Sequence, residues 1–370
     1  MARVIRVRDI LNFLERGFAD VTRQYDWDNS GKQLVLQDQE IKKAALALDP
    51  SEKVIEKAIK EGCGLLITHH PLFFGKIRSL DFSRPFDRKI INAIKSNLSV
   101  ISAHTSLDLA DYSLNDYICT LLGAEIVSTF VPEGRHEFVK FAVFVPETHA
   151  EAVRGAMIKA GGGHIGNYSG CTFSTAGTGT FMPGEGTNPF IGTKGELERV
   201  AELRIETIID KRKLNSLIAE VVKAHPYEEV AHDIYTLDMG KNYGLGRVGA
   251  FKESMSAESF LKLVKEKLGL DTVRLNMKPE GRTVQKFAVV TGSGASMWNK
   301  CRGAGVDVLL TGDMKHHDAL DARENGVMIA DAGHFETERI FMEYLAGIIS
   351  REFKIDTVLI EEDPSVINWR

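Results

Sequence analysis

The sequence predicts an α/β protein: a duplicated α/β domain with a ferredoxin-like α+β domain inserted between its two halves. Three observations lead to this fold class. Short apolar runs alternate with helical patterns toward both ends of the chain, histidines and carboxylates follow the ends of those runs, and the middle of the chain has a different order of elements. The 370 residues suffice for two or three domains of roughly 100–200 residues each.

The first part, residues 1–130, alternates strands and helices. Its predicted elements are an amphipathic helix over 7–18, a buried strand at 42–49, a helix over 51–62, a second buried strand at 64–68, a helix over 86–95 and a strand at 99–103. Ser51 is the expected N-cap of its helix, and Gly62 the expected stop. This alternation is typical of a parallel or mostly parallel sheet.

The last part, residues 239–370, repeats the rhythm. It predicts strands at 287–292, 306–312 and 326–332, helices over 295–305 and 316–325, and one long helix over 334–349. Residues 62–70 also align without gaps on residues 305–313, and a further apolar strand follows each of them. We interpret this match as an internal duplication.

The middle part, residues 131–238, follows another order. Strands are predicted at 137–147, 197–210 and 228–237 and helices over 148–161 and 213–225, and the glycine-rich stretch 161–186 is expected to form a twisted strand and a mobile loop. The resulting order, βαββαβ, is that of a ferredoxin-like domain.

Composition narrows the classes of function. The chain is 44% hydrophobic and 26% charged, with a net charge of −5, which gives no general electrostatic attraction to nucleic acid or an anionic membrane. No apolar run approaches the roughly 20 residues of a membrane span, and the N-terminus has charges throughout, unlike a signal or transit peptide. Four scattered cysteines without a CxxC pair predict a reduced, cytoplasmic protein.

Six of the eleven histidines stand at or just beyond predicted strand ends of the duplicated domain: His69, His70, His104, His316, His317 and His334. In open α/β sheets, sites form outside the carboxyl ends of the strands, where loops converge. Three strand ends therefore each deliver an imidazole to one region, and two of them also deliver a carboxylate.

These residues predict a metal site. His69 and His70 can diverge toward two ions on a loop that leaves a strand, and His334 and Glu338 lie one helical turn apart. Asp108 could bridge two ions with its two oxygens, although a helix N-cap would also explain it. Imidazoles together with carboxylates suit zinc, iron or manganese.

Other polar residues have open roles. His104 is either a ligand or a partner of a ligand, and Glu336 is expected to face solvent. His316 and His317 either contact a substrate or simply begin a helix.

Three further motifs give weaker signals. Residues 291–296, TGSGAS, form a tight turn whose amides could hold an anion. Residues 27–31, WDNSG, are expected to be a structural turn before the first strand, and the histidines and acids of 225–233 are expected to be solvated rather than metal-binding.

The motifs WDNSG, THHP, AHTSLD, GDMKHHDA and GHFETE resemble those of the NIF-three-like family, whose members are often labelled GTP cyclohydrolase 1 type 2 homologues. The resemblance spans both ends of the chain, and the middle part, with HPYEEV, resembles the PII-like or CutA-like insert of the longer bacterial members. It implies a two-metal site, and matching residue by residue gives as ligands His69, His70, Asp108, His334 and Glu338. It also implies a ring-like homohexamer with the metal sites facing the interior.

Two functions follow from this pattern. The first is a metal-dependent hydrolase of the GTP cyclohydrolase type, acting on a nucleotide-like or other small substrate. Its two divalent ions would activate a water and polarise the substrate, while His104, His316 or His317 carry protons. The second is a metal-binding scaffold or regulator in which the insert senses a small ligand or a partner.

Overall fold

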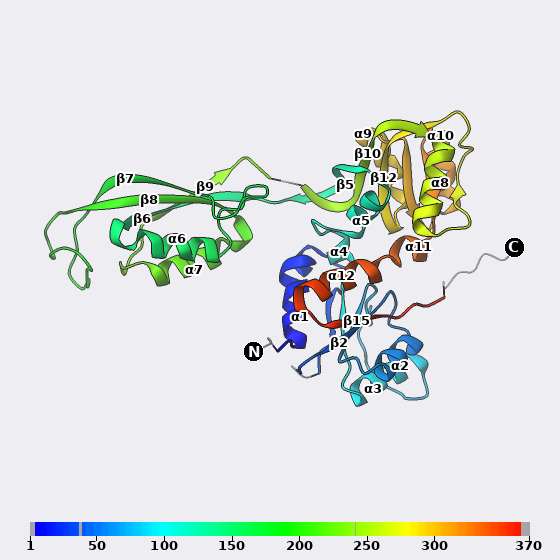
Figure 1. Ribbon diagram of the computed structural model, residues 1–370, viewed down its shortest axis with the longest axis horizontal. Coiled ribbons are helices and arrows are strands. Elements are labelled where there is room, and N and C mark those ends of the chain that lie inside the picture. Colours follow the sequence, from blue (N-terminus) through cyan, green and yellow to red (C-terminus); the bar gives the residue numbers. More distant parts are fainter. Residues whose placement is uncertain (1–3, 37–38, 241, 364–370) are drawn as a thin grey trace. The chain divides into compact units, whose positions relative to one another are not determined.

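The computed structural model describes residues 4–36, 39–240 and 242–363, so the outermost residues of the predicted domains, 1–3 and 364–370, lie outside the described residues. The chain divides into two compact units. One comprises residues 1–133 together with 243–370, and the other comprises residues 134–242. The architecture is mixed α/β, with three separate sheets (Figure 1).

The first sheet of the larger unit has the strand order β1-β4-β3-β2-β15. Its strands are β1 (Gly31–Leu34), β2 (Lys43–Ala47), β3 (Leu65–Thr68), β4 (Ser99–Ser102) and β15 (Asp356–Leu359). β15, β2, β3 and β4 run parallel, and β1 is antiparallel to β4. β2, β3 and β4 are buried almost throughout, because helices cover both faces of the sheet.

One face of this sheet packs against α1 (Val7–Phe13) and α12 (Phe341–Phe353), and the other against α2 (Glu52–Lys60) and α3 (Pro85–Lys95). Ser51 caps α2 by accepting a hydrogen bond from the Val54 amide, as predicted. The predicted helix over 7–18 is split into α1 and a π-helical turn at Leu14–Phe18.

The second sheet has the order β11-β14-β13-β12-β10-β5. Its strands are β5 (Glu125–Arg135), β10 (Asn242–Ser256), β11 (Arg274–Leu275), β12 (Thr283–Ser293), β13 (Val308–Gly312) and β14 (Met328–Asp331). β12, β13 and β14 are parallel, whereas β10 is antiparallel to β12 and β11 is antiparallel to β14. Each sheet thus includes a strand from the other end of the chain: β15 joins the first and β5 the second.

Helices also cover both faces of the second sheet. α5 (Leu114–Leu121) and α8 (Ala257–Leu268) pack on one face, and α9 (Cys301–Ala304) and α10 (His316–Glu324) on the other. The helix predicted over 295–305 is instead a 3₁₀ segment, Ala295–Lys300, followed by the single turn of α9.

The prediction of a single long helix over 334–349 is wrong, because this segment forms two helices, α11 (His334–Glu338) and α12. Thr337 lies at the break. Its Oγ1 is 2.8 Å from the carbonyl oxygen of Gly333 and 3.0 Å from that of His334, a type of back-bonding that bends helices. The same oxygen accepts a hydrogen bond from the Gly292 amide, which ties α11 to the end of β12.

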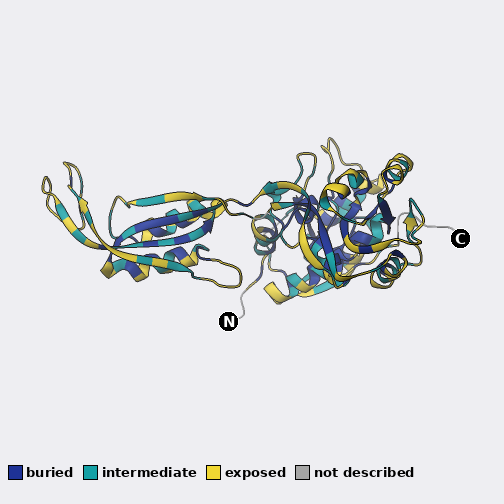
Figure 2. Cartoon of the chain, turned by 90° about the horizontal axis from the view of Figure 1, so that it is seen from above, coloured by how far each residue is buried: buried dark blue, intermediate teal, exposed yellow. Residues whose placement is uncertain are grey.

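The smaller unit has a four-stranded antiparallel sheet in the order β7-β8-β6-β9. Its strands are β6 (Phe138–Pro146), β7 (Thr172–Phe181), β8 (Glu198–Asp210) and β9 (His232–Leu237), and its helices are α6 (Ala150–Lys159) and α7 (Leu214–Ala224). Alternate residues of β6 and β8 form a core with the two helices, and buried residues follow the strands of both units (Figure 2). The strand expected within the glycine-rich stretch 161–186 is β7, which pairs with β8.

Among the described residues, no helix is both long and apolar enough to cross a membrane.

Candidate metal centre

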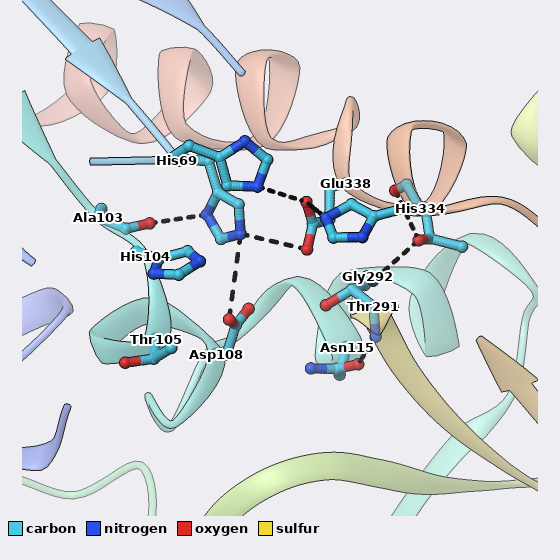
Figure 3. A network of polar contacts seen from close by, with 12 residues as sticks. His69, Ala103, His104, Thr105, Asp108, Asn115, Thr291, Gly292, His334 and Glu338 are labelled. Atoms are coloured by element: carbon cyan, nitrogen blue, oxygen red, sulfur yellow. Dashed lines mark hydrogen bonds and ion pairs between the residues drawn. The ribbon is translucent and has the colours of Figure 1, made fainter. Parts of the chain in front are cut away.

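Six polar side chains meet where the carboxyl ends of both parallel sheets of the larger unit come together. They are His69, His70, His104, Asp108, His334 and Glu338 (Figure 3). His69 and His70 directly follow β3, and their amides still bond to the carbonyls of Ala47 and Leu48 beside β2. This continued pairing holds the two imidazoles at the edge of the first sheet.

The other four come from helix starts near strand ends. His104 precedes the short helix α4 (Thr105–Asp108), which follows β4, and Asp108 is its last residue; the amides of Leu107 and Asp108 both bond to the His104 carbonyl. His334 and Glu338 stand at the two ends of α11, which follows β14. The i, i+4 spacing places both on one face of that helix, as predicted.

Each of the four imidazoles is held through its Nδ1 atom. His70 bonds to Asp49 at 2.8 Å, His104 to Asp28 at 2.7 Å and His334 to Asp313 at 2.7 Å, while His69 bonds to the carbonyl oxygen of Ala103 at 2.8 Å. Carboxylate and carbonyl oxygens only accept hydrogen bonds, so Nδ1 carries the proton in each pair. Nε2 is then the free ligand atom, which is how proteins orient histidines around metal ions.

The free Nε2 atoms converge on Glu338. Its Oε2 lies 3.1 Å from Nε2 of His70 and 2.9 Å from Nε2 of His334, and its Oε1 lies 3.6 Å from Nε2 of His69. Asp108 lies on the His69 side, with Oδ2 4.0 Å from that Nε2. The ligand atoms of two sets, His69–His70–His104 and His70–His334–Glu338, all lie within 4.8 Å of one another.

Unpartnered buried atoms show that this donor set fits a metal ion. Nε2 of His69, Oδ1 of Asp108 and Oε2 of Glu338 are buried without a geometrically acceptable hydrogen bond. Unsatisfied buried polar atoms are costly, and three of them converge here among imidazoles and carboxylates. Nitrogen and oxygen ligands of this kind suit zinc, iron or manganese better than calcium or magnesium.

The pKa values of the clustered groups also show that the site favours a positive charge. The adjacent Glu338 carboxylate, against the opposing effect of burial, raises the pKa of His334 to about 9. Burial would lower the pKa of His70, but Asp49 and Glu338 outweigh it and raise that pKa to about 10. Burial likewise opposes the ionised form of Glu338, yet the neighbouring histidines hold its pKa well below the usual range. Protons thus provide the positive charge that a metal ion would bring.

The pKa of Asp108 shifts in the opposite direction from that of Glu338. Burial raises the pKa of the Asp108 carboxyl, and the charge of His69 only partly offsets this. A nearby cation would favour its ionised form.

Two glycines make room for the cluster. Gly292, at the end of β12, has a φ of +65°, and a Cβ there would lie 2.1 Å from Oε1 of Glu338. A Cβ on Gly312, at the end of β13, would lie 2.5 Å from the backbone nitrogen of His334. The TGSGAS segment, predicted as a tight turn, therefore also gives Glu338 access to the histidines.

Asp28 is a residue that the sequence analysis assigned only to a structural turn. Its side chain is fully buried, and besides His104 it accepts hydrogen bonds from Ser30, from the Thr105 amide and from the Thr105 hydroxyl. The rings of Trp27 and Phe74 contact His104 edge-on, at centroid distances of 5.9 and 6.0 Å. The WDNSG turn thus fixes the orientation of one imidazole of the cluster.

Asp49 and Asp313, which hold His70 and His334 and were also not predicted, share one feature of the sequence. Each stands just beyond a buried parallel strand, β2 or β13, and so reaches the same edge as the histidines. An acid in that position could have been picked out by the strand-end argument.

Two predicted residues are not brought into the cluster. His316 and His317 begin α10, are exposed and contact each other with ring centroids 5.3 Å apart. Within the described residues, neither makes a hydrogen bond or ion pair with the six clustered side chains. His225 serves a structural role instead, since its Nε2 lies 2.9 Å from the Phe144 carbonyl oxygen.

Comparison with known proteins shows what this chain is similar to. The profile of the Duf34/NIF3 (NGG1p interacting factor 3) family matches residues 5–365. A Halalkalibacterium halodurans protein named GTP cyclohydrolase 1 type 2 homolog is 42% identical over 308 residues, covering 83% of this chain and 82% of its own. A Bacillus subtilis protein of the same name is 37% identical over 344 residues, covering 93% and 91%.

A solved structure agrees with these relatives. The crystal structure of a Bacillus cereus protein related to NIF3 superposes with a TM-score of 0.87 at 35% identity and covers 99% of this chain and all of its own.

Proposed function

This chain belongs to the Duf34/NIF3 family, and on that premise we propose that it is a metal-dependent hydrolase of the GTP cyclohydrolase type 2-like class, acting on a nucleotide-like or other small substrate. One observation carries the proposal. Imidazoles from both ends of the chain present free Nε2 atoms to one buried carboxylate, that of Glu338. Such an arrangement is the kind of site that binds divalent metals.

We propose two divalent ions per chain, zinc, iron or manganese, held by His69, His70, Asp108, His334 and Glu338. The two oxygens of Glu338 support two ions, because Oε1 faces His69 and Oε2 faces His70 and His334. Bound divalent ions supply Lewis acidity and lower the pKa of water, which is the chemistry of metal-dependent hydrolysis.

The protein's own residues position and protonate the reactants. His104 is the proposed proton carrier, because Asp28 fixes its tautomer and points its Nε2 toward His69 and His70. The edge-on contacts with Trp27 and Phe74 further restrict its ring. His316 and His317 are proposed to contact the substrate from the exposed start of α10, which follows β13 at the same sheet edge.

A second function is favoured by a different observation. The smaller unit has a cavity of about 580 Å³, lined mainly by residues of β7, β8 and the segment before β9. This supports the alternative that the chain is a metal-binding scaffold or regulator whose middle part senses a small ligand.

We further propose that residues 1–130 and 239–370 are duplicated halves of one metal domain and that residues 131–238 are an inserted ferredoxin-like domain. The compact unit at 134–242 and its strand order β7-β8-β6-β9, with one helix after β6 and one after β8, support the insertion. The matching β-α-β order before and after it supports the duplication. A homohexamer in the cytoplasm is also proposed, and the four free cysteines fit that compartment.

Metal-dependent turnover tests the proposed function. Purified protein is treated with a chelator, reloaded with zinc, manganese or iron, and assayed against a panel of nucleotides that includes GTP. We expect hydrolysis that requires the metal, that Glu338→Gln abolishes and that the matched variant Glu336→Gln retains. Metal-loaded wild-type protein that turns over no member of the panel would favour the scaffold.

A further inference from the structure

A cavity of about 580 Å³ lies on the open face of the sheet of the smaller unit. In β8, Leu203 and Ile205 point into the core under α6 and α7, so the alternate residues Glu202 and Arg204 point to the opposite face. Those two residues and Phe144 of β6 line the cavity, which is large enough for a small organic molecule.

Glycines of β7 create the space. Gly177 lies opposite Glu202 in the ladder, and a Cβ built on it would meet no atom within 4 Å. A Cβ on Gly179 would lie 2.1 Å from Oε2 of Glu202, so the carboxylate occupies room that only glycine leaves. The walls around this hollow are mostly apolar and include the rings of Phe144, Phe181 and Tyr227.

The carboxylate of Glu202 is the polar centre of the cavity. Only 8% of this residue is exposed, and within the described part of the chain no cation forms an ion pair with it. Arg204, the basic residue of the lining, is engaged elsewhere: it lies 3.4 Å from Glu206 and over the ring of Tyr235. A buried carboxylate without a cation is costly, and a bound cation would relieve that cost.

A second buried polar group lies beside Glu202. The hydroxyl of Tyr227 is buried and lacks a hydrogen bond of acceptable geometry. Burial, and after it the neighbouring Glu202 carboxylate, raises the pKa of the Tyr227 phenol above its usual range.

The rim of the cavity adds negative charge. Glu228 and Glu229 lie there, and Glu228 accepts a hydrogen bond of 2.9 Å from the Asn188 amide, which fastens the loop between β7 and β8 over the cavity. Anionic ligands would therefore meet a repulsive entrance.

We propose that this cavity binds a small organic cation, an amine, amidine or guanidine on a flat or aliphatic apolar body, with Glu202 pairing with the charged group. Aromatic rings around a carboxylate suit such a ligand, because they hold its apolar body and attract its charge. The site belongs entirely to the smaller unit and does not depend on metal binding or on hydrolysis.

Three probes of equal shape and different charge test the proposal on the full chain by isothermal titration calorimetry: benzamidine, benzamide and benzoate. We expect one benzamidine per chain, bound at least tenfold more tightly than benzamide, with benzoate weakest of the three. Glu202→Gln should weaken benzamidine at least tenfold, to about the level of benzamide. Glu185→Gln, an exposed acid outside the lining, is the matched control and should bind as wild type.

A second variant keeps the test independent of Glu202. A Cβ on residue 177 meets no protein atom within 4 Å, so Gly177→Val adds its side chain to the hollow and should abolish binding of benzamidine and benzamide alike. The double variant His334→Ala, Glu338→Ala should bind benzamidine as wild type does, which separates this site from the metal centre. The proposal is overturned if benzamidine fails to bind, if it binds no more tightly than benzamide, or if neither cavity variant weakens it.

Discussion

Gly292 and Glu338 lie so close together that the space between them leaves no room for a side chain on residue 292. A Cβ there would lie 2.1 Å from Oε1 of the glutamate. Gly292, the last residue but one of β12, leaves the room in which the carboxylate reaches the three histidines around it. The backbone there also has a φ of +65°, which other residues adopt only with strain.

Gly292→Ala is therefore expected to displace Glu338 and to lose at least one metal ion per chain. The strained backbone should also lower the free energy of unfolding by about 1–2 kcal/mol. Gly303→Ala is the control, since a Cβ in that turn of α9 meets no atom within 4 Å. Elemental analysis and thermal unfolding read out both effects, and an unchanged metal content in Gly292→Ala would contradict the coupling.

Asp28 and Asp26 form a second matched pair. Asp28→Asn removes the charge that orients His104 and should reduce turnover or metal affinity roughly 10- to 100-fold, the usual effect of losing such a partner. Asp26→Asn, two residues away and exposed, should leave both unchanged. Equal behaviour of the two variants in metal titrations and assays would remove His104 from the proposed chemistry.

The clustered side chains could be predicted from the sequence because the ends of buried strands are visible in local patterns. Short apolar runs such as residues 64–68 form buried parallel strands, and parallel strands bring their carboxyl ends to one edge. His69, Asp108 and Glu338 could therefore be picked out from the sequence. Which oxygen faces which imidazole could not, because Glu338 meets the histidines through the packing of two sheets.

The helix break and the role of Asp28 could not be predicted from the sequence, because both depend on contacts between distant parts of the chain. Just before the break between α11 and α12, the Thr337 hydroxyl bonds both to its own helix and to the Gly292 amide. Periodicity continues across that break and so predicts one helix. Asp28 precedes a strand rather than following one, and only the folded chain brings it to His104.

Excision of the smaller unit tests whether the larger one is a complete metal domain. The chain leaves at Glu133 and returns at Tyr243, and a Cβ on Gly244 would lie 2.1 Å from the Val131 carbonyl oxygen, so the two ends are close. Replacing residues 134–242 by a short Gly/Ser linker should give a folded protein that still binds metal. Aggregation of this variant, or loss of its metal, would count against a discontinuous domain.

Asp210 makes the stability of the smaller unit depend on pH. Burial opposes its ionised form, but His136 and Arg212 outweigh burial and lower its pKa below the value of about 3.9 expected in the unfolded chain. A lowered folded pKa stabilises the fold above the unfolded pKa, and this contribution declines as the pH falls below about 4.

Asp210→Asn should accordingly cost about 1 kcal/mol at pH 7 and progressively less toward pH 3. Asp238→Asn, which breaks an exposed pair with Arg135, should have little effect at either pH. Thermal unfolding at the two pH values measures the difference. A cost for Asp210→Asn that stays constant or grows on acidification would show that its charge is not the stabilising feature.

The metal content of purified protein tests the central claim most directly, measured by elemental analysis on the wild type, Glu338→Gln and the matched variant Glu336→Gln. The wild type should hold about two transition-metal ions per chain, as two-metal sites do. Glu338→Gln should lose at least one of them, because the carboxylate between His70 and His334 becomes a neutral amide. Glu336→Gln should match the wild type. Wild-type protein that is free of metal after gentle purification, and that takes up neither zinc nor manganese when they are added, would contradict the account.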